Sequence, residues 1–190
     1  RSPGSTLKPL IYGLAFDRGL AHPETLIEDR PTAFGTYLPQ NFDNQFRGTV
    51  RVRNALQLSL NIPVVSILDR LGPARLMQSI SRTGGKPFVP GGQAGLAVGL
   101  GGLGMSLADL MRVYGTLARG GTAMGLQYFG DEPTSETTRV LAASAAWQVG
   151  DILAGAARPA SAAVRGSRAV KVKRATSPRS WRIGVARSAV

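Results

Sequence analysis

The sequence contains no cysteine and only one histidine, and aromatic residues make up 6% of its 190 residues. Without cysteine there is no disulfide framework and no cysteine-ligated zinc site. A Ser-His-Asp triad would have to use the single His22, which stands before Pro23. No apolar run reaches the roughly 18 residues that a membrane-spanning helix needs. The chain also lacks an initiator Met and a signal peptide, so we expect an internal piece of a longer protein.

Acidic residues are absent from the last part of the chain. Residues 1–151 carry 14 Lys and Arg against 11 Asp and Glu, whereas residues 152–190 carry 9 Lys and Arg and no acid. The net charge of +12 therefore lies mainly in a basic tail, whose only aromatic residue for base stacking is Trp181. We expect no nucleic-acid partner. The open alternative is a basic module that binds nucleic acid or anionic lipid through residues 156–190.

Apolar periodicity and breaker residues indicate a mostly helical domain. Hydrophobic residues make up 43% of a chain whose length suits one domain. Ser106 and Asp109 form a capping-box pattern, and Asn61 is a candidate helix N-cap. Residues 21–48 predict a long extended loop, and residues 138–141 predict a weak strand. The predicted helices cover residues 5–13, 51–58, 62–71, 73–82, 107–119 and 143–153.

Two short motifs contain side chains suited to nucleophilic catalysis. Ser5 and Lys8 are three residues apart, which places them on one face of a helix whose N-terminus favours developing negative charge. A lysine activates a serine hydroxyl only when burial or nearby cations lower its pKa. Ser59 and Asn61, two residues apart between two helices, can project a hydroxyl and an amide into the same space. The plain alternative for the first motif is an N-cap serine with a solvated lysine, and for the second it is Asn61 as an ordinary helix cap.

Two further segments invite a functional interpretation. Residues 99–104, GLGGLG, resemble a phosphate-binding loop but lack the Lys-Ser/Thr ending, so close packing or tight turns explain the glycines better. Lys173, Thr176 and Ser177 stand where a third catalytic motif of the Lys-Thr-Gly type would be expected. The alternative is that this segment is simply tail.

Eight stretches of the chain carry a family resemblance: RSPGSTLKPL (1–10), YGLAFD (12–17), HPET (22–25), YLPQNFD (37–43), GTV (48–50), RNALQLSLNIP (53–63), GPARL (72–76) and LARGG (117–121). Together they resemble the transpeptidase domain of class A bifunctional penicillin-binding proteins, most closely their C type. The resemblance extends to about residue 154, and in it Ser5–Lys8 and Ser59–Asn61 correspond to the S-x-x-K and S-x-N motifs.

The resemblance implies an α+β, β-lactamase/transpeptidase-like serine acyl-enzyme fold, truncated at both ends so that mainly the helical lobe is present. It implies that Ser5 attacks a peptidoglycan stem peptide at D-Ala-D-Ala, that a neighbouring stem amine completes the cross-link, and that β-lactams acylate the same serine. Lys8 would be the base, Ser59 would shuttle a proton and Asn61 would hold the substrate amide. The backbone N–H of Ser5 would form half of the oxyanion hole.

The same resemblance implies a periplasmic domain of a parent protein that also carries a peptidoglycan glycosyltransferase domain and an inner-membrane anchor. It implies no cofactor and no metal. Alternatives within the fold are a D-alanine carboxypeptidase, a serine β-lactamase and an inactive penicillin-binding piece. A β-lactamase would need a carboxylate that activates a deacylating water.

The third motif departs from the family pattern. Lys173, Thr176 and Ser177 agree with it as substrate-binding residues, but Arg174 replaces a small hydroxyl residue and Ala175 replaces glycine. We therefore divide the chain into a partial transpeptidase domain, residues 1–155, and a divergent basic tail, residues 156–190. One hypothesis is a degraded or frame-shifted coding end. If no other reading frame of the DNA encodes Lys-Thr-Gly-Thr-Ser here, the frame-shift hypothesis fails.

Overall fold

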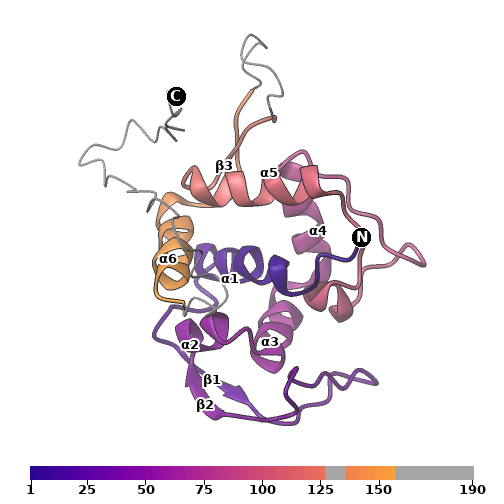
Figure 1. Ribbon diagram of the computed structural model, residues 1–190, viewed down its shortest axis with the longest axis vertical. Coiled ribbons are helices and arrows are strands. Elements are labelled where there is room, and N and C mark those ends of the chain that lie inside the picture. Colours follow the sequence, from indigo (N-terminus) through magenta and orange to yellow (C-terminus); the bar gives the residue numbers. More distant parts are fainter. Residues whose placement is uncertain (127–135, 157–190) are drawn as a thin grey trace, which may run out of the picture. The chain divides into compact units, whose positions relative to one another are not determined.

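The computed structural model describes residues 1–126 and 136–156, which form helices and two small antiparallel sheets (Figure 1). This composition confirms the predicted, mainly helical α+β class. The predicted basic tail, apart from Ala156, lies outside the described residues. The helices are α1 (Lys8–Asp17), α2 (Val52–Gln57), α3 (Asn61–Leu71), α4 (Pro73–Arg82), α5 (Leu107–Ala118) and α6 (Ala143–Ala154), with 3-10 turns η1 (Gly4–Leu7) and η2 (Leu96–Leu100). The strands are β1 (Leu26–Asp29), β2 (Gly48–Arg51), β3 (Thr122–Ala123) and β4 (Thr138–Arg139).

Helix α1 lies at the centre of the hydrophobic core. Its residues from Lys8 to Phe16 are all buried, which is expected of a helix that is apolar on every side. It packs against α3 and α6 and also contacts α2 and α4 (Figure 1). Lys8 is the only charged side chain in this helix that is buried, and only 1% of it is exposed.

The prediction that this first helix ends at Gly13 was wrong. Gly13 lies inside α1, where an added Cβ would stand 3.2 Å from Leu141 Cδ1 and 3.3 Å from Val149 Cγ2. The glycine therefore allows α6 and the segment before it to approach α1 closely. The helix continues to Asp17, whose carboxylate accepts a hydrogen bond from the backbone N–H of Ala142 at 2.7 Å.

The other predicted helices are confirmed, with small shifts at their ends. The capping box at the start of α5 is present: Ser106 Oγ accepts a hydrogen bond from the N–H of Asp109 at 3.0 Å, and the Asp109 carboxylate accepts one from the N–H of Ser106 at 3.2 Å. The predicted strand at 138–141 is shorter than expected, because only Thr138–Arg139 pairs, with Thr122–Ala123.

The predicted loop at 21–48 contains a strand that the sequence did not reveal. Strand β1 pairs antiparallel with β2, with Leu26 opposite Arg51 and Asp29 opposite Gly48. Each strand has only four residues, and the polar Glu-Asp ending of β1 hides its alternation. Loop 30–47 therefore begins and ends at neighbouring positions of this small sheet, and the strand pairing fixes both of its ends.

The glycine-rich segment packs against the first residues of the chain. Gly101 has a φ of +91°, and a Cβ there would overlap the backbone nitrogen and Cα of Gly4. Ser2 Oγ donates a hydrogen bond to the Gly101 carbonyl at 2.6 Å. A Cβ at Gly99 would stand 2.7 Å from Leu68 Cδ2. These contacts confirm close packing as the role of the glycines, and they hold the backbone that leads into Ser5.

We predict that Gly101→Ala destabilises the chain, because the new methyl group would occupy the space of Gly4 and the left-handed backbone disfavours alanine. The expected loss in the free energy of unfolding is about 1–3 kcal/mol. Gly150→Ala is the matched control, since Gly150 lies in exposed helix with open space around it. That change should stabilise by about 0.5–1 kcal/mol. Urea unfolding measures both, and an unchanged stability for Gly101→Ala would contradict the packing described.

Candidate active site

Ser5 lies on the 3-10 turn η1, and Lys8 begins α1 directly after it. The sequence predicts both in one α-helix, but Gly4, with a φ of +55°, opens a tighter first turn. In a 3-10 turn the side chains at i and i+3 are eclipsed, so Ser5 and Lys8 still share a face. Ser5 is exposed to solvent whereas Lys8 is buried. Tyr114 of α5 donates a hydrogen bond to the Thr6 carbonyl at 3.0 Å and so holds the turn from the other side.

The Lys8 ammonium group binds three oxygen atoms from the second motif. Nζ donates to the Ser59 carbonyl at 2.5 Å, to Ser59 Oγ at 3.1 Å and to Asn61 Oδ1 at 2.6 Å. An ammonium group has three N–H donors, so all of its donors have partners. The two motifs, separated by about fifty residues, therefore meet at one nitrogen atom.

Ser59 holds a strained backbone conformation at this meeting point. Its φ is +55°, in the left-handed region that residues with a side chain rarely adopt. It stands between α2 and α3, and its carbonyl and hydroxyl oxygens both reach Lys8 Nζ. Strain of this kind concentrates at functional sites, because the surrounding structure must hold it in place.

Burial lowers the pKa of Lys8 from its ordinary value of 10.5 to about 8. No carboxylate forms an ion pair with Lys8 among the residues that the structure describes, so no negative charge offsets the effect of desolvation on the ammonium form. When Lys8 is neutral it has two N–H donors and one lone pair. Two donors suffice for its two shorter contacts, to the Ser59 carbonyl and Asn61 Oδ1, and the lone pair is then free to accept a proton.

Asn61 is the first residue of α3, but its side chain does not cap that helix. The interpretation of Asn61 as a plain N-cap was therefore wrong. Oδ1 accepts from Lys8, and Nδ2 donates to the Gln40 carbonyl at 2.6 Å. One hydrogen of Nδ2 and one lone pair of Oδ1 are left for another polar group, since an amide offers two of each.

Two sets of candidate residues remain, the third motif and His22. Lys173, Thr176 and Ser177 lie outside the described residues. His22 Nδ1 accepts a hydrogen bond from the N–H of Glu24 at 3.3 Å, a contact within its own loop. In residues 1–126 and 136–156 there is no group of acidic or histidine side chains that could hold a metal ion, and no helix is long and apolar enough to cross a membrane.

The sequence did not indicate that Asn41 and Asp29 hold the backbone of Asn61 through hydrogen bonds. Asn41 accepts a hydrogen bond from the backbone N–H of Asn61 at 2.8 Å and is itself bound to the buried Asp29. Both residues lie in the segment expected to be an extended loop. Asn residues are common in loops, so composition gave no reason to single out Asn41; only its place in the stretch YLPQNFD marked it.

Comparison with known proteins identifies the family of the chain. The sequence-family model of the penicillin-binding protein transpeptidase domain matches residues 1–175. Penicillin-binding protein 1C of Escherichia coli is 41% identical over 160 residues, which is 84% of this chain and 21% of that protein. Penicillin-binding protein 1F of Bacillus subtilis is 35% identical over 125 residues, 64% of this chain and 17% of that protein. The chain thus spans about a fifth of the length of these relatives.

A solved structure shares the fold. The transpeptidase domain of Burkholderia pseudomallei penicillin-binding protein 3 superposes with a TM-score of 0.68 and 23% sequence identity, over 80% of this chain and 52% of that one. This likeness confirms the expected transpeptidase-like fold. The family match over most of the residues confirms the resemblance drawn from the motifs. The chain belongs to the penicillin-binding protein transpeptidase family.

Proposed function

We propose that this chain carries a serine D,D-transpeptidase centre that cross-links peptidoglycan stem peptides and is acylated by β-lactams at Ser5. The observation that supports this proposal most strongly is the convergence of Ser59 and Asn61 on Lys8 Nζ at 2.5–3.1 Å. A buried lysine with a lowered pKa, one turn from an exposed serine, is the arrangement that activates a hydroxyl nucleophile.

Acylation begins when Ser5 Oγ attacks the carbonyl carbon of the penultimate D-Ala and gives its proton to neutral Lys8. The backbone N–H of Ser5 serves as one donor to the oxyanion. The tetrahedral intermediate collapses, the peptide C–N bond breaks, and the departing D-Ala amine takes a proton from Lys8 through the Ser59 hydroxyl. Asn61 orients the substrate with the donor and lone pair that its present contacts leave unused. An ester on Ser5 remains.

Transfer reverses these proton movements. The amine of a second stem peptide attacks the ester carbonyl and loses a proton to the centre, and the ester C–O bond breaks. Ser5 Oγ regains its proton, and the two stem peptides are joined by an amide. Lys173, Thr176 and Ser177 remain proposed substrate-binding residues in this scheme.

A serine β-lactamase is less well supported. Such an enzyme needs a carboxylate that activates water, and no Asp or Glu side chain forms a hydrogen bond with Lys8, Ser59 or Asn61 within the described part of the chain. We therefore expect a long-lived penicillin ester. By relation to the class A relatives, we place the domain in the bacterial periplasm, within a parent that carries a glycosyltransferase domain and an inner-membrane anchor.

We predict that fluorescent penicillin labels the chain covalently and that Ser5→Ala abolishes the label, because Ser5 supplies the attacking oxygen. Ser144→Ala is the matched control, since Ser144 is also an exposed serine near the start of a helix. Gel fluorescence and intact-protein mass should show one adduct per chain. A folded chain that takes no label, or an adduct that persists in Ser5→Ala, would refute the assigned nucleophile.

The acylation rate should rise with pH. With the pKa of Lys8 at about 8, its neutral fraction increases about tenfold between pH 7 and pH 9, from about a tenth to about nine-tenths. The rate rises with pH because the ammonium form of Lys8 has no lone pair with which to accept the Ser5 proton. Stopped-flow labelling at a fixed penicillin concentration measures the profile. A rate that is flat or falls over this range would contradict Lys8 as the base.

The hydroxyl and the backbone of Ser59 should have separable effects. Ser59→Ala and Ser59→Gly both remove the proton shuttle, so both should lower the acylation rate, by about 10²-fold or more. Glycine fits a φ of +55° better than alanine, so the glycine variant should be the more stable by about 1 kcal/mol. Thermal unfolding beside labelling rates tests both points. Equal stabilities would show that the left-handed conformation is not strained.

A further inference from the structure

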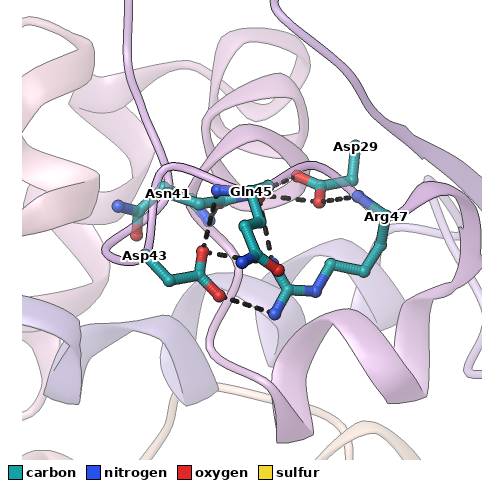
Figure 2. Close-up of polar contacts among 6 residues, drawn as sticks. Asp29, Asn41, Asp43, Gln45 and Arg47 are labelled. Atoms are coloured by element: carbon teal, nitrogen blue, oxygen red, sulfur yellow. Dashed lines mark hydrogen bonds and ion pairs between the residues drawn. The ribbon is translucent and has the colours of Figure 1, made fainter.

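Asn41 is buried, with 4% of its surface exposed, and both the nitrogen and the oxygen of its side-chain amide form hydrogen bonds (Figure 2). Nδ2 donates to Asp29 Oδ1 at 2.9 Å, to Asp29 Oδ2 at 3.0 Å and to the Gln45 carbonyl at 2.8 Å. Oδ1 accepts from the backbone N–H of Asn61 at 2.8 Å. Because Nδ2 faces three oxygen atoms, the orientation of the amide is settled by its partners.

Asp29 holds this amide from the end of β1. Its side chain is fully buried, and both carboxylate oxygens accept hydrogen bonds, from Asn41 and from the N–H of Arg47 at 2.8 Å. Asp29 ends β1, just before loop 30–47, and pairs with Gly48 of β2, which follows that loop. A buried carboxylate needs such donors, since removing one leaves it partly unsatisfied. Asn41 is therefore attached to the sheet and not only to its own loop.

Asn41 also completes the N-terminus of α3. The first N–H groups of a helix lack partners within the helix, and Leu60, at the cap position, supplies none. Pro63 has no N–H, and the N–H of Asn61 is bound by Asn41 from a distant loop. The neighbouring Gln40 carbonyl binds Asn61 Nδ2. Consecutive loop residues thus fix the backbone and the side chain of Asn61, whose Oδ1 contacts Lys8.

We propose that Asn41 is a positioning residue for the acylation centre: held by Asp29, it fixes Asn61 and through it the contact with Lys8 Nζ. The proposal rests on the proposed function for its effect on rate. Asn41 acts through Asn61, two hydrogen bonds away from Lys8. Asp43, in the same loop, provides the contrast. Its carboxylate pairs with Arg47 at 2.6 Å on the surface, and it has no bond to Asn61 (Figure 2).

The test is a double-mutant cycle on the acylation rate of the full chain by fluorescent penicillin. Asn41→Ala should lower the rate by about 10–100-fold, the loss expected when a supporting hydrogen bond to an active-site group is removed. In an Asn61→Ala background, Asn41→Ala should lower the rate by less than about twofold, because the Asn61 side chain through which Asn41 acts on Lys8 is already absent. Asp43→Asn is the control and should stay within about twofold. An equal loss in both backgrounds, or no loss, overturns the proposal.

A rescue pair addresses a variant that fails to fold. Asn41→Asp keeps the acceptor for Asn61 but sets a second carboxylate against Asp29, so the rate should fall at least about tenfold. Adding Asp29→Asn restores a donor between the two side chains and should raise the rate at least about threefold above that of Asn41→Asp alone. Circular dichroism reports the fold of each variant. If the exchange gives no recovery, positioning through the Asp29–Asn41 pair is refuted.

Amide hydrogen exchange separates this proposal from the proposed function, because it needs no acylation. The N–H of Asn61 should exchange at least about tenfold faster in Asn41→Ala than in the unaltered chain, and Asp43→Asn should leave it unchanged. A chain that takes no penicillin but shows this change keeps the positioning role while the proposed function fails. Unchanged exchange in Asn41→Ala overturns the positioning role whatever the labelling shows.

Discussion

The burial of one lysine is the constraint on which the candidate site depends. An ammonium group inside a protein is costly unless each N–H has a partner, and Lys8 meets this need with three oxygen atoms from Ser59 and Asn61. None of these oxygens belongs to a carboxylate, so the ammonium form is solvated but not neutralised. Desolvation by burial, with no carboxylate to offset it, therefore lowers the pKa of Lys8 to about 8. Proton acceptance near neutral pH follows from that balance.

The fold supplies these partners from segments far apart in the sequence. Helix α1 carries Lys8 into the core because its other residues are apolar on every side. Ser59 adopts a left-handed conformation between α2 and α3, where neighbouring helices hold it. On the opposite side, Gly101 packs against Gly4 and fixes the backbone that leads into Ser5. Close packing at Gly101 and the strained backbone of Ser59 therefore both position atoms of the candidate site around Ser5 and Lys8.

Much of this could be predicted from the sequence, and the exceptions have physical reasons. Periodicity and capping patterns predicted α3 to α5 well, since local residues decide those helices. The end of α1 was missed because Gly13 serves a tertiary contact with α6, which no local pattern reveals. Strand β1 was missed because it is short and its partner lies beyond an eighteen-residue loop, 30–47. The resemblance brought together Ser5, Lys8, Ser59 and Asn61, but a lone Asn41 in a loop carried no signal of its own.

The candidate site depends on a lysine that loses its proton far more readily than lysine in water. The most direct measurement is a titration of the Lys8 side chain by NMR of its ¹³Cε resonance, with Lys8→Arg to assign the signal among the four lysines of the chain. We predict a pKa of about 8 for Lys8. A value near the ordinary 10.5 would mean that Lys8 stays protonated at neutral pH, and would contradict its assignment as the base that activates Ser5.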